Sequence, residues 1–195
     1  MEPFRRTRGG GARARLAASE ASLLRSLVGQ VMTLIAPEGF EPRPGAPGEP
    51  DGADIAALEA LLHEPAGSPG ESPAAPEDPV LARLLPDGYR DDPEAAGEFR
   101  RYTESGLRSG KQQAAQAMLD TLPDSGGRIQ LTRDQAVAWL KALNDVRLAL
   151  GVRLGVTEDF EEQWASLNAE DPQWAAFEVY AWLGAVQESL VQALA

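Results

Sequence analysis

The longest uninterrupted helical pattern in the chain covers residues 132–156, TRDQAVAWLKALNDVRLALGVRLGV, and it constrains the fold more than any other stretch. Apolar side chains recur along it at alternating steps of three and four residues, on two separate stripes. The first stripe comprises Ala136, Leu140, Leu143, Leu150 and Leu154, and the second comprises Trp139, Ala142, Val146, Ala149 and Val156. A helix with two apolar stripes needs cover from more than one direction. The stretch is therefore predicted to be the central helix of a helical domain.

One arginine interrupts each stripe, Arg147 in the first and Arg153 in the second, and Asn144 lies close to Arg147. Two interpretations stay open. In the structural one, a half-buried arginine pairs with an acid on the last helix, because burying an unpaired guanidinium lowers stability by roughly several kcal/mol. Glu188 is the first choice for that acid. In the functional one, an arginine lines a groove and binds the carboxylate of a partner.

Further helical patterns flank this helix, at residues 19–36, 79–85, 93–122, 157–167 and 172–194. Residues 4–16 alternate around Gly9–Gly11, which predicts a small hairpin, and residues 128–131 are a candidate strand to pair with it. Ser19 is the predicted N-cap of the first helix. Thr132 and Gln135 form a predicted capping box, and Gly155 is the predicted end of the central helix. We therefore predict a mainly α protein, a helical bundle of about five to seven helices with a minor N-terminal β-hairpin and short strand element.

Composition changes sharply between residues 37 and 77. Ten of the chain's 15 prolines lie in residues 37–79, and residues 37–80 hold ten acids against Arg43. Such a segment buries too little apolar surface to offset its ordering entropy, so it is predicted to be a disordered linker, with a transient helix at residues 54–62. A lone N-terminal helix is unstable. Residues 1–36 are therefore expected to dock on the helical body, residues 78–195, as one domain.

The 195 residues carry a net charge of −12, which opposes broad electrostatic binding to nucleic acid. The charge is uneven, however, because residues 1–30 contain six arginines against two glutamates. The arginines nearest the amino terminus are candidates for contact with nucleic acid or with an acidic protein surface. They are Arg5, Arg6, Arg8, Arg13 and Arg15. A solvated N-terminus without a binding role remains the alternative.

Residue types that support catalysis or metal binding are scarce. The chain has no cysteine, and its single histidine, His63, falls in the predicted linker, so thiol chemistry, histidine catalysis and histidine metal sites are not expected. Gly110-Lys111 fails the phosphate-loop pattern, because Ser105 and Gln112 replace the required residues. No signal peptide or membrane span is recognisable. We expect a soluble cytoplasmic protein that is not an enzyme and has no cofactor, metal or small-molecule substrate.

Three segments together resemble a known family: DPVLARLLPDGYRDDPEAAGEFRRYTE (78–104), ALNDVRLALGVRLGVTED (142–159) and VYAWLGAVQESLV (179–191). They are similar to the actinobacterial oxidative-stress regulator (AosR-like) family, formerly a domain of unknown function encoded beside the ClpS adaptor and a sulfur-carrier and cysteine-synthesis cluster. The resemblance covers most of residues 13–36 and 78–194.

The resemblance implies a cytoplasmic regulator that responds to oxidative stress and acts on transcription through protein contact with RNA polymerase or a sigma factor. The gene neighbours suggest an alternative, an accessory protein for ClpS-dependent proteolysis or for sulfur-carrier and cysteine biosynthesis. The redox switch ascribed to the family is a cysteine pair near the N-terminus, which this chain lacks. Sensing by an intramolecular disulfide is therefore impossible here.

Overall fold

The computed structural model describes residues 1–36, 76–89, 91–168, 171 and 173–195. The predicted linker helix at 54–62 and His63 lie outside these residues, and the proposed domain division stays a prediction.

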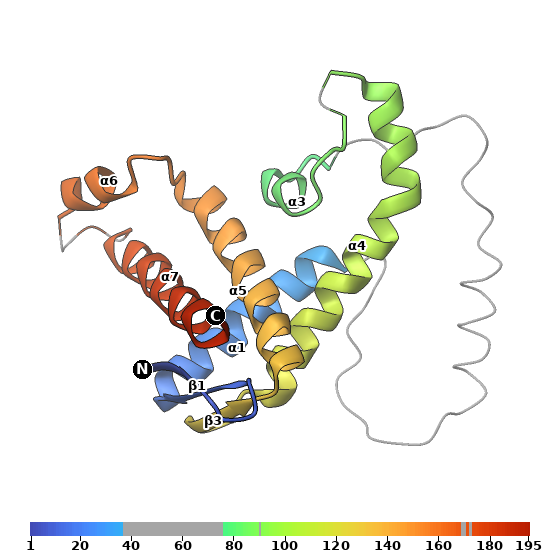
Figure 1. The fold of residues 1–195 in the computed structure, drawn as a ribbon. Coiled ribbons are helices and arrows are strands. Elements are labelled where there is room, and N and C mark those ends of the chain that lie inside the picture. The colour runs from blue at the N-terminus through green and yellow to red at the C-terminus, as the bar shows by residue number, and fades with distance from the viewer. Residues whose placement is uncertain (37–75, 90, 169–170, 172) are drawn as a thin grey trace.

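The described residues form a bundle of helices with one small sheet, which confirms the predicted fold class (Figure 1). The helices are α1 (Ala18–Ile35), α3 (Pro79–Leu84), α4 (Pro93–Thr121), α5 (Arg133–Leu154), α6 (Phe160–Ser166) and α7 (Trp174–Leu194). The strands are β1 (Glu2–Arg6), β2 (Ala12–Leu16) and β3 (Gly127–Leu131). Figure 1 shows the sheet at one end of the bundle, with α3 and α6 toward the other end.

The sheet is antiparallel with strand order β1-β2-β3, so the predicted hairpin and its pairing with a strand from residues 128–131 are confirmed. The hairpin turn brings the backbone of Gly11 against the end of β3. A Cβ atom at Gly11 would lie 2.0 Å from the carbonyl oxygen of Leu131, so only glycine fits this position.

Helix α5 is the centre of the bundle, as its two apolar stripes predict, and it packs against α1, α3, α4 and α7. Trp139 of α5 is fully buried, and its indole Nε1 donates a hydrogen bond of 2.7 Å to Oγ1 of Thr121 on α4. The edge of the Phe4 ring from β1 meets Trp139 with 5.7 Å between centroids. The sheet is thereby fixed to the core.

The helix ends follow local sequence signals, with one correction. Thr132 and Gln135 form the predicted capping box of α5, and Gly155 ends that helix in the left-handed conformation with φ 63°. The predicted N-cap Ser19, however, lies inside the first turn of α1. Ala17 is the N-cap, because the carboxylate of Glu20 accepts a hydrogen bond of 2.7 Å from the Ala17 backbone N–H and so supplies the cap from within the helix.

Candidate functional site

The first candidate surface is the outer face of the sheet. Strand β2 alternates, with Ala12, Ala14 and Leu16 buried and the arginines between them exposed. Cross-strand pairing then places Arg5 of β1 opposite Arg13, and Arg128 of β3 opposite Arg15. Residues that pair directly across antiparallel strands share a face. We call Arg5, Arg13, Arg15 and Arg128 the basic sheet face.

The charge of the basic sheet face is not neutralised within the described part of the chain. Six ion pairs form among the described residues, and none of these four arginines takes part in one. Two arginine pairs stand directly opposite each other, an arrangement that destabilises a sheet, while Arg15 also has Glu2 opposite it on β1. A depression of about 610 Å³ lies on this face, and Glu2, Arg5, Arg13, Arg15 and Arg128 contribute to its lining.

The five N-terminal arginines predicted as a contact group are thus divided by the structure. All five are exposed, but Arg6 pairs with the inward-facing Ala12, and Arg8 lies in the hairpin turn, so neither joins the basic sheet face. Arg128 joins it instead, although it is more than a hundred residues away in sequence. The sequence indicates a strand at residues 128–131, but it does not show which residues of β2 this strand faces. The pairing register is set by tertiary packing, so the sequence alone could not place Arg128 beside Arg15.

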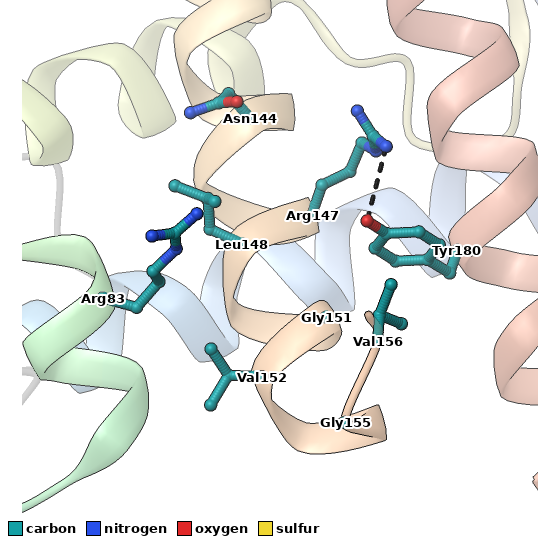
Figure 2. Close-up of a pocket in the computed structure, with 9 residues that line it drawn as sticks. All are labelled: Arg83, Asn144, Arg147, Leu148, Gly151, Val152, Gly155, Val156 and Tyr180. Atoms are coloured by element: carbon teal, nitrogen blue, oxygen red, sulfur yellow. Dashed lines mark hydrogen bonds between the residues drawn. The ribbon is translucent and has the colours of Figure 1, made fainter. Parts of the chain in front are cut away.

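The second candidate surface is a groove on α5 between α3 and α7, at the far end of the bundle from the sheet (Figures 1 and 2). It has a volume of about 280 Å³, and we call it the α5 groove. Its lining comprises Arg83, Asn144, Arg147, Leu148, Gly151, Val152, Gly155, Val156 and Tyr180. Figure 2 shows Arg83 reaching from α3 toward Leu148, while Arg147 leans toward Tyr180 of α7.

Gly151 lets α7 approach the groove closely, since a Cβ there would lie 3.3 Å from the Tyr180 ring. Aromatic residues continue from this point toward α6. The ring of Phe160 lies 5.1 Å from that of Tyr180 and stacks on Phe177 at 5.7 Å. Of these three rings only Phe177 is buried, so Tyr180 and Phe160 stay partly open to solvent beside the groove.

The predicted pairing of Arg147 with Glu188 is wrong. Arg147 donates from Nη1 to Oε1 of Gln187 at 3.0 Å and from Nη2 to the Tyr180 hydroxyl at 3.5 Å, and its guanidinium carbon lies 5.0 Å from the centre of the Tyr180 ring. Glu188 is exposed and accepts from Gln192 on its own helix. Adjacent helical residues point about 100° apart, which follows from 3.6 residues per turn. The rotation of α7 presents Gln187, and not Glu188, to α5.

The other two residues predicted here are exposed. Arg153 donates from Nη1 to Oε1 of Gln30 on α1 at 3.4 Å, and Asn144 lies on the rim of the α5 groove. The buried charge on α5 is Asp145, which the sequence analysis did not single out. Its Oδ1 accepts from the ammonium of Lys111 on α4 at 2.6 Å.

The family model described as a domain of unknown function, DUF2017, matches residues 1–194. The chain belongs to the DUF2017 family. Two relatives, from Mycobacterium tuberculosis and Mycobacterium bovis, carry the name "Oxidative stress regulator AosR". Each is 37% identical to this chain over 93% of the chain and 81% of the relative. A Mycobacterium leprae relative is 44% identical over 61% of this chain and 59% of its own length. No solved structure matches.

The family assignment confirms the predicted resemblance and bears on how this DUF2017 chain is controlled. It has no cysteine anywhere in its sequence, so no disulfide forms within it. Within the described residues, no cluster of three or more histidine, cysteine, aspartate or glutamate side chains is arranged to hold a metal ion. None of the helices in the described ranges is both long and apolar enough to cross a bilayer.

Proposed function

We propose that this chain is a non-enzymatic cytoplasmic regulator of transcription in the oxidative-stress response. It acts by protein contact with the transcription machinery, RNA polymerase or a sigma factor, and its contact surface is the basic sheet face. The name carried by its relatives supports the regulatory role. The observation that supports the contact surface is the concentration of four arginines that form no ion pair among the described residues, on a chain whose net charge is −12.

The cross-strand arginine pairs favour a binding role over a merely solvated surface. Like charges directly opposite each other on a sheet lower its stability by about 0.2–1 kcal/mol per pair. Proteins retain locally unfavourable arrangements mainly where function requires them. An acidic segment of a partner that lies over Arg13 and Arg15 neutralises the repulsion between the arginines. Relief of this repulsion adds to the free energy of binding.

An acidic protein surface fits the basic sheet face better than nucleic acid does. Sequence-tolerant binding to single strands uses exposed aromatic rings as stacking platforms. The phenylalanine of β1, Phe4, points inward against Trp139, and the residues that surround the four arginines on the outer face are Glu2 and Gln130. The net charge of −12 also repels a phosphate backbone beyond the immediate contact. DNA contact is therefore the weaker proposal.

The test is affinity capture from a native lysate, with the intact chain compared with the double variant Arg13→Gln/Arg15→Gln and the control Arg6→Gln/Arg8→Gln. The control removes the same charge from the same hairpin but spares the basic sheet face. We expect the wild type and the control to capture RNA polymerase subunits or a sigma factor, and the Arg13/Arg15 variant to lose them.

Four results would contradict the proposal. Capture of Clp components in place of polymerase would favour the accessory role in ClpS-dependent proteolysis, and enzymes of sulfur transfer would favour the biosynthetic alternative. Equal loss of polymerase with both double variants would show that net charge alone, and not the basic sheet face, governs the contact. A nuclease treatment that abolishes capture would indicate that nucleic acid bridges the two proteins.

A further inference from the structure

The α5 groove contains an arginine whose charge is not balanced by an acid within the described part of the chain. Arg147 is half-buried, and the groups that face its guanidinium are neutral: the Gln187 amide, the Tyr180 hydroxyl and the Tyr180 ring. Its Nε is buried and has no hydrogen-bond partner among the described residues, and none of the six ion pairs there includes Arg147. A guanidinium removed from water in this way gains stability from an anion.

The groove around Arg147 has the other features of a ligand site. Figure 2 shows a second cation, the exposed Arg83, on the other side of α5 from Arg147, together with the amide of Asn144 and with Leu148. Leu148, Val152 and Val156 supply apolar surface. A volume of about 280 Å³ is just below the range of about 300–1,000 Å³ that is usual for binding sites of small molecules, so the ligand must be compact.

The two ends of the groove differ in polarity, which orients a ligand. The carboxyl end of α5, at Gly155, carries the partial negative charge of the helix dipole and repels an anion. Val152 and Val156 lie at that end. Asn144 and Arg147 lie two to three turns earlier along the helix, away from the negative end. An anionic group therefore belongs near Arg147, and an apolar body belongs over the two valines.

We propose that the α5 groove binds a small organic anion, a carboxylate or phosphate ester with a compact apolar body, with Arg147 and Arg83 as its charge partners. Tyr180 holds the Arg147 guanidinium in place and offers its ring to the ligand. The inference stands apart from the proposed contact with the transcription machinery, because the groove and the basic sheet face lie at opposite ends of the bundle. It gives a cysteine-free chain a means of receiving a chemical signal.

The experiment is a titration of the intact chain followed by nuclear magnetic resonance, with the backbone amides of Gly151 and Val152 as reporters. The probes are phenylacetate and phenyl phosphate, and phenylacetamide is the neutral control of the same shape. We expect saturable shifts at the reporters with at least one anion, and none with phenylacetamide. Arg147→Gln weakens that binding by about tenfold or more, as expected for a lost charge-assisted hydrogen bond.

Two further variants keep the test decisive. Arg153→Gln removes a cation from the same helix outside the groove and is expected to bind like the wild type. Arg83→Gln changes an exposed residue, so it carries the test if Arg147→Gln fails to fold, and it is expected to weaken binding severalfold. The proposal is overturned if both anions leave the reporters unshifted at 10 mM, roughly ten times the concentration for an interaction of about −4 kcal/mol. Equal binding of the neutral control, or unchanged binding by both groove variants, overturns it as well.

Discussion

Removing Lys111 should destabilise the protein more than removing its only other lysine, Lys141. The side chain of Asp145 is 6% exposed and that of Lys111 is 20% exposed, with 2.6 Å between Nζ and Oδ1. Lys111→Met leaves the carboxylate of Asp145 buried without a partner, which typically costs about 3–5 kcal/mol. Because Lys111 keeps some contact with solvent, we expect the lower end, about 3 kcal/mol. For a chain of this size the midpoint of thermal unfolding should fall by roughly 6–12 °C.

The assay is urea unfolding followed by circular dichroism, with Lys141→Met as the matched control. Lys141 is exposed, and this control should stay within about 0.5 kcal/mol of the wild type. The double variant Lys111→Met/Asp145→Leu removes both charges and should recover to within about 1 kcal/mol of the wild type. The reasoning is refuted if Lys111→Met costs no more than Lys141→Met, or if adding Asp145→Leu to it lowers stability further.

Three more predictions concern the sheet, the first helix and oxidation. Gly11→Ala should destabilise by more than about 1 kcal/mol in urea, because its Cβ would meet the Leu131 carbonyl, whereas Gly9→Ala has open space and should be nearly neutral. Burial raises the pKa of Glu20, but hydrogen bonds from the amino-terminal ammonium and the Ala17 amide outweigh this and leave the pKa below its usual 4.5. Glu20→Gln should therefore lower the unfolding free energy by about 1–2 kcal/mol at pH 7. In a pH series, the stability difference between wild type and variant should shrink as pH falls below 4.5 and through the pKa of Glu20 in the folded protein. A stability difference that stays constant with pH would contradict this. Mild peroxide should leave the circular dichroism spectrum unchanged, since the chain has no thiol; a change reversed by dithiothreitol would contradict it.

Features that depend on local sequence could be predicted. The two stripes of α5 specify a helix covered on several sides, Thr132 and Gln135 mark its start, and Gly155 marks its end. These signals work because caps and hydrophobic periodicity act over a few residues. The sequence could also suggest, as one of two alternatives, that Arg147 lines a groove. An arginine within an apolar stripe needs either a counter-ion or a ligand.

Features that depend on the rotation and register of separate elements could not be predicted. The choice of Glu188 as the partner of Arg147 failed by one residue, because a helix turns about 100° per residue and nothing local fixes the rotation of α7. Arg128 could not be grouped with Arg13 and Arg15, since the pairing of β3 with β2 joins segments separated by α1, α3 and α4. For the same reason Asp145 could not be matched with Lys111.

The central proposal, that the basic sheet face contacts the transcription machinery, is tested most directly by binding to purified RNA polymerase holoenzyme over a range of salt concentrations. Exposed charge pairs contribute about 0.2–1 kcal/mol each, so Arg13→Gln/Arg15→Gln should lose about 0.4–2 kcal/mol, which is roughly a twofold to thirtyfold rise in Kd. The same variant should unfold at equal or higher urea concentration than the wild type, because it relieves two arginine pairs. Wild-type binding should weaken with added salt. Absence of binding by the wild type, or an equal Kd for the variant at every salt concentration, would contradict the proposal.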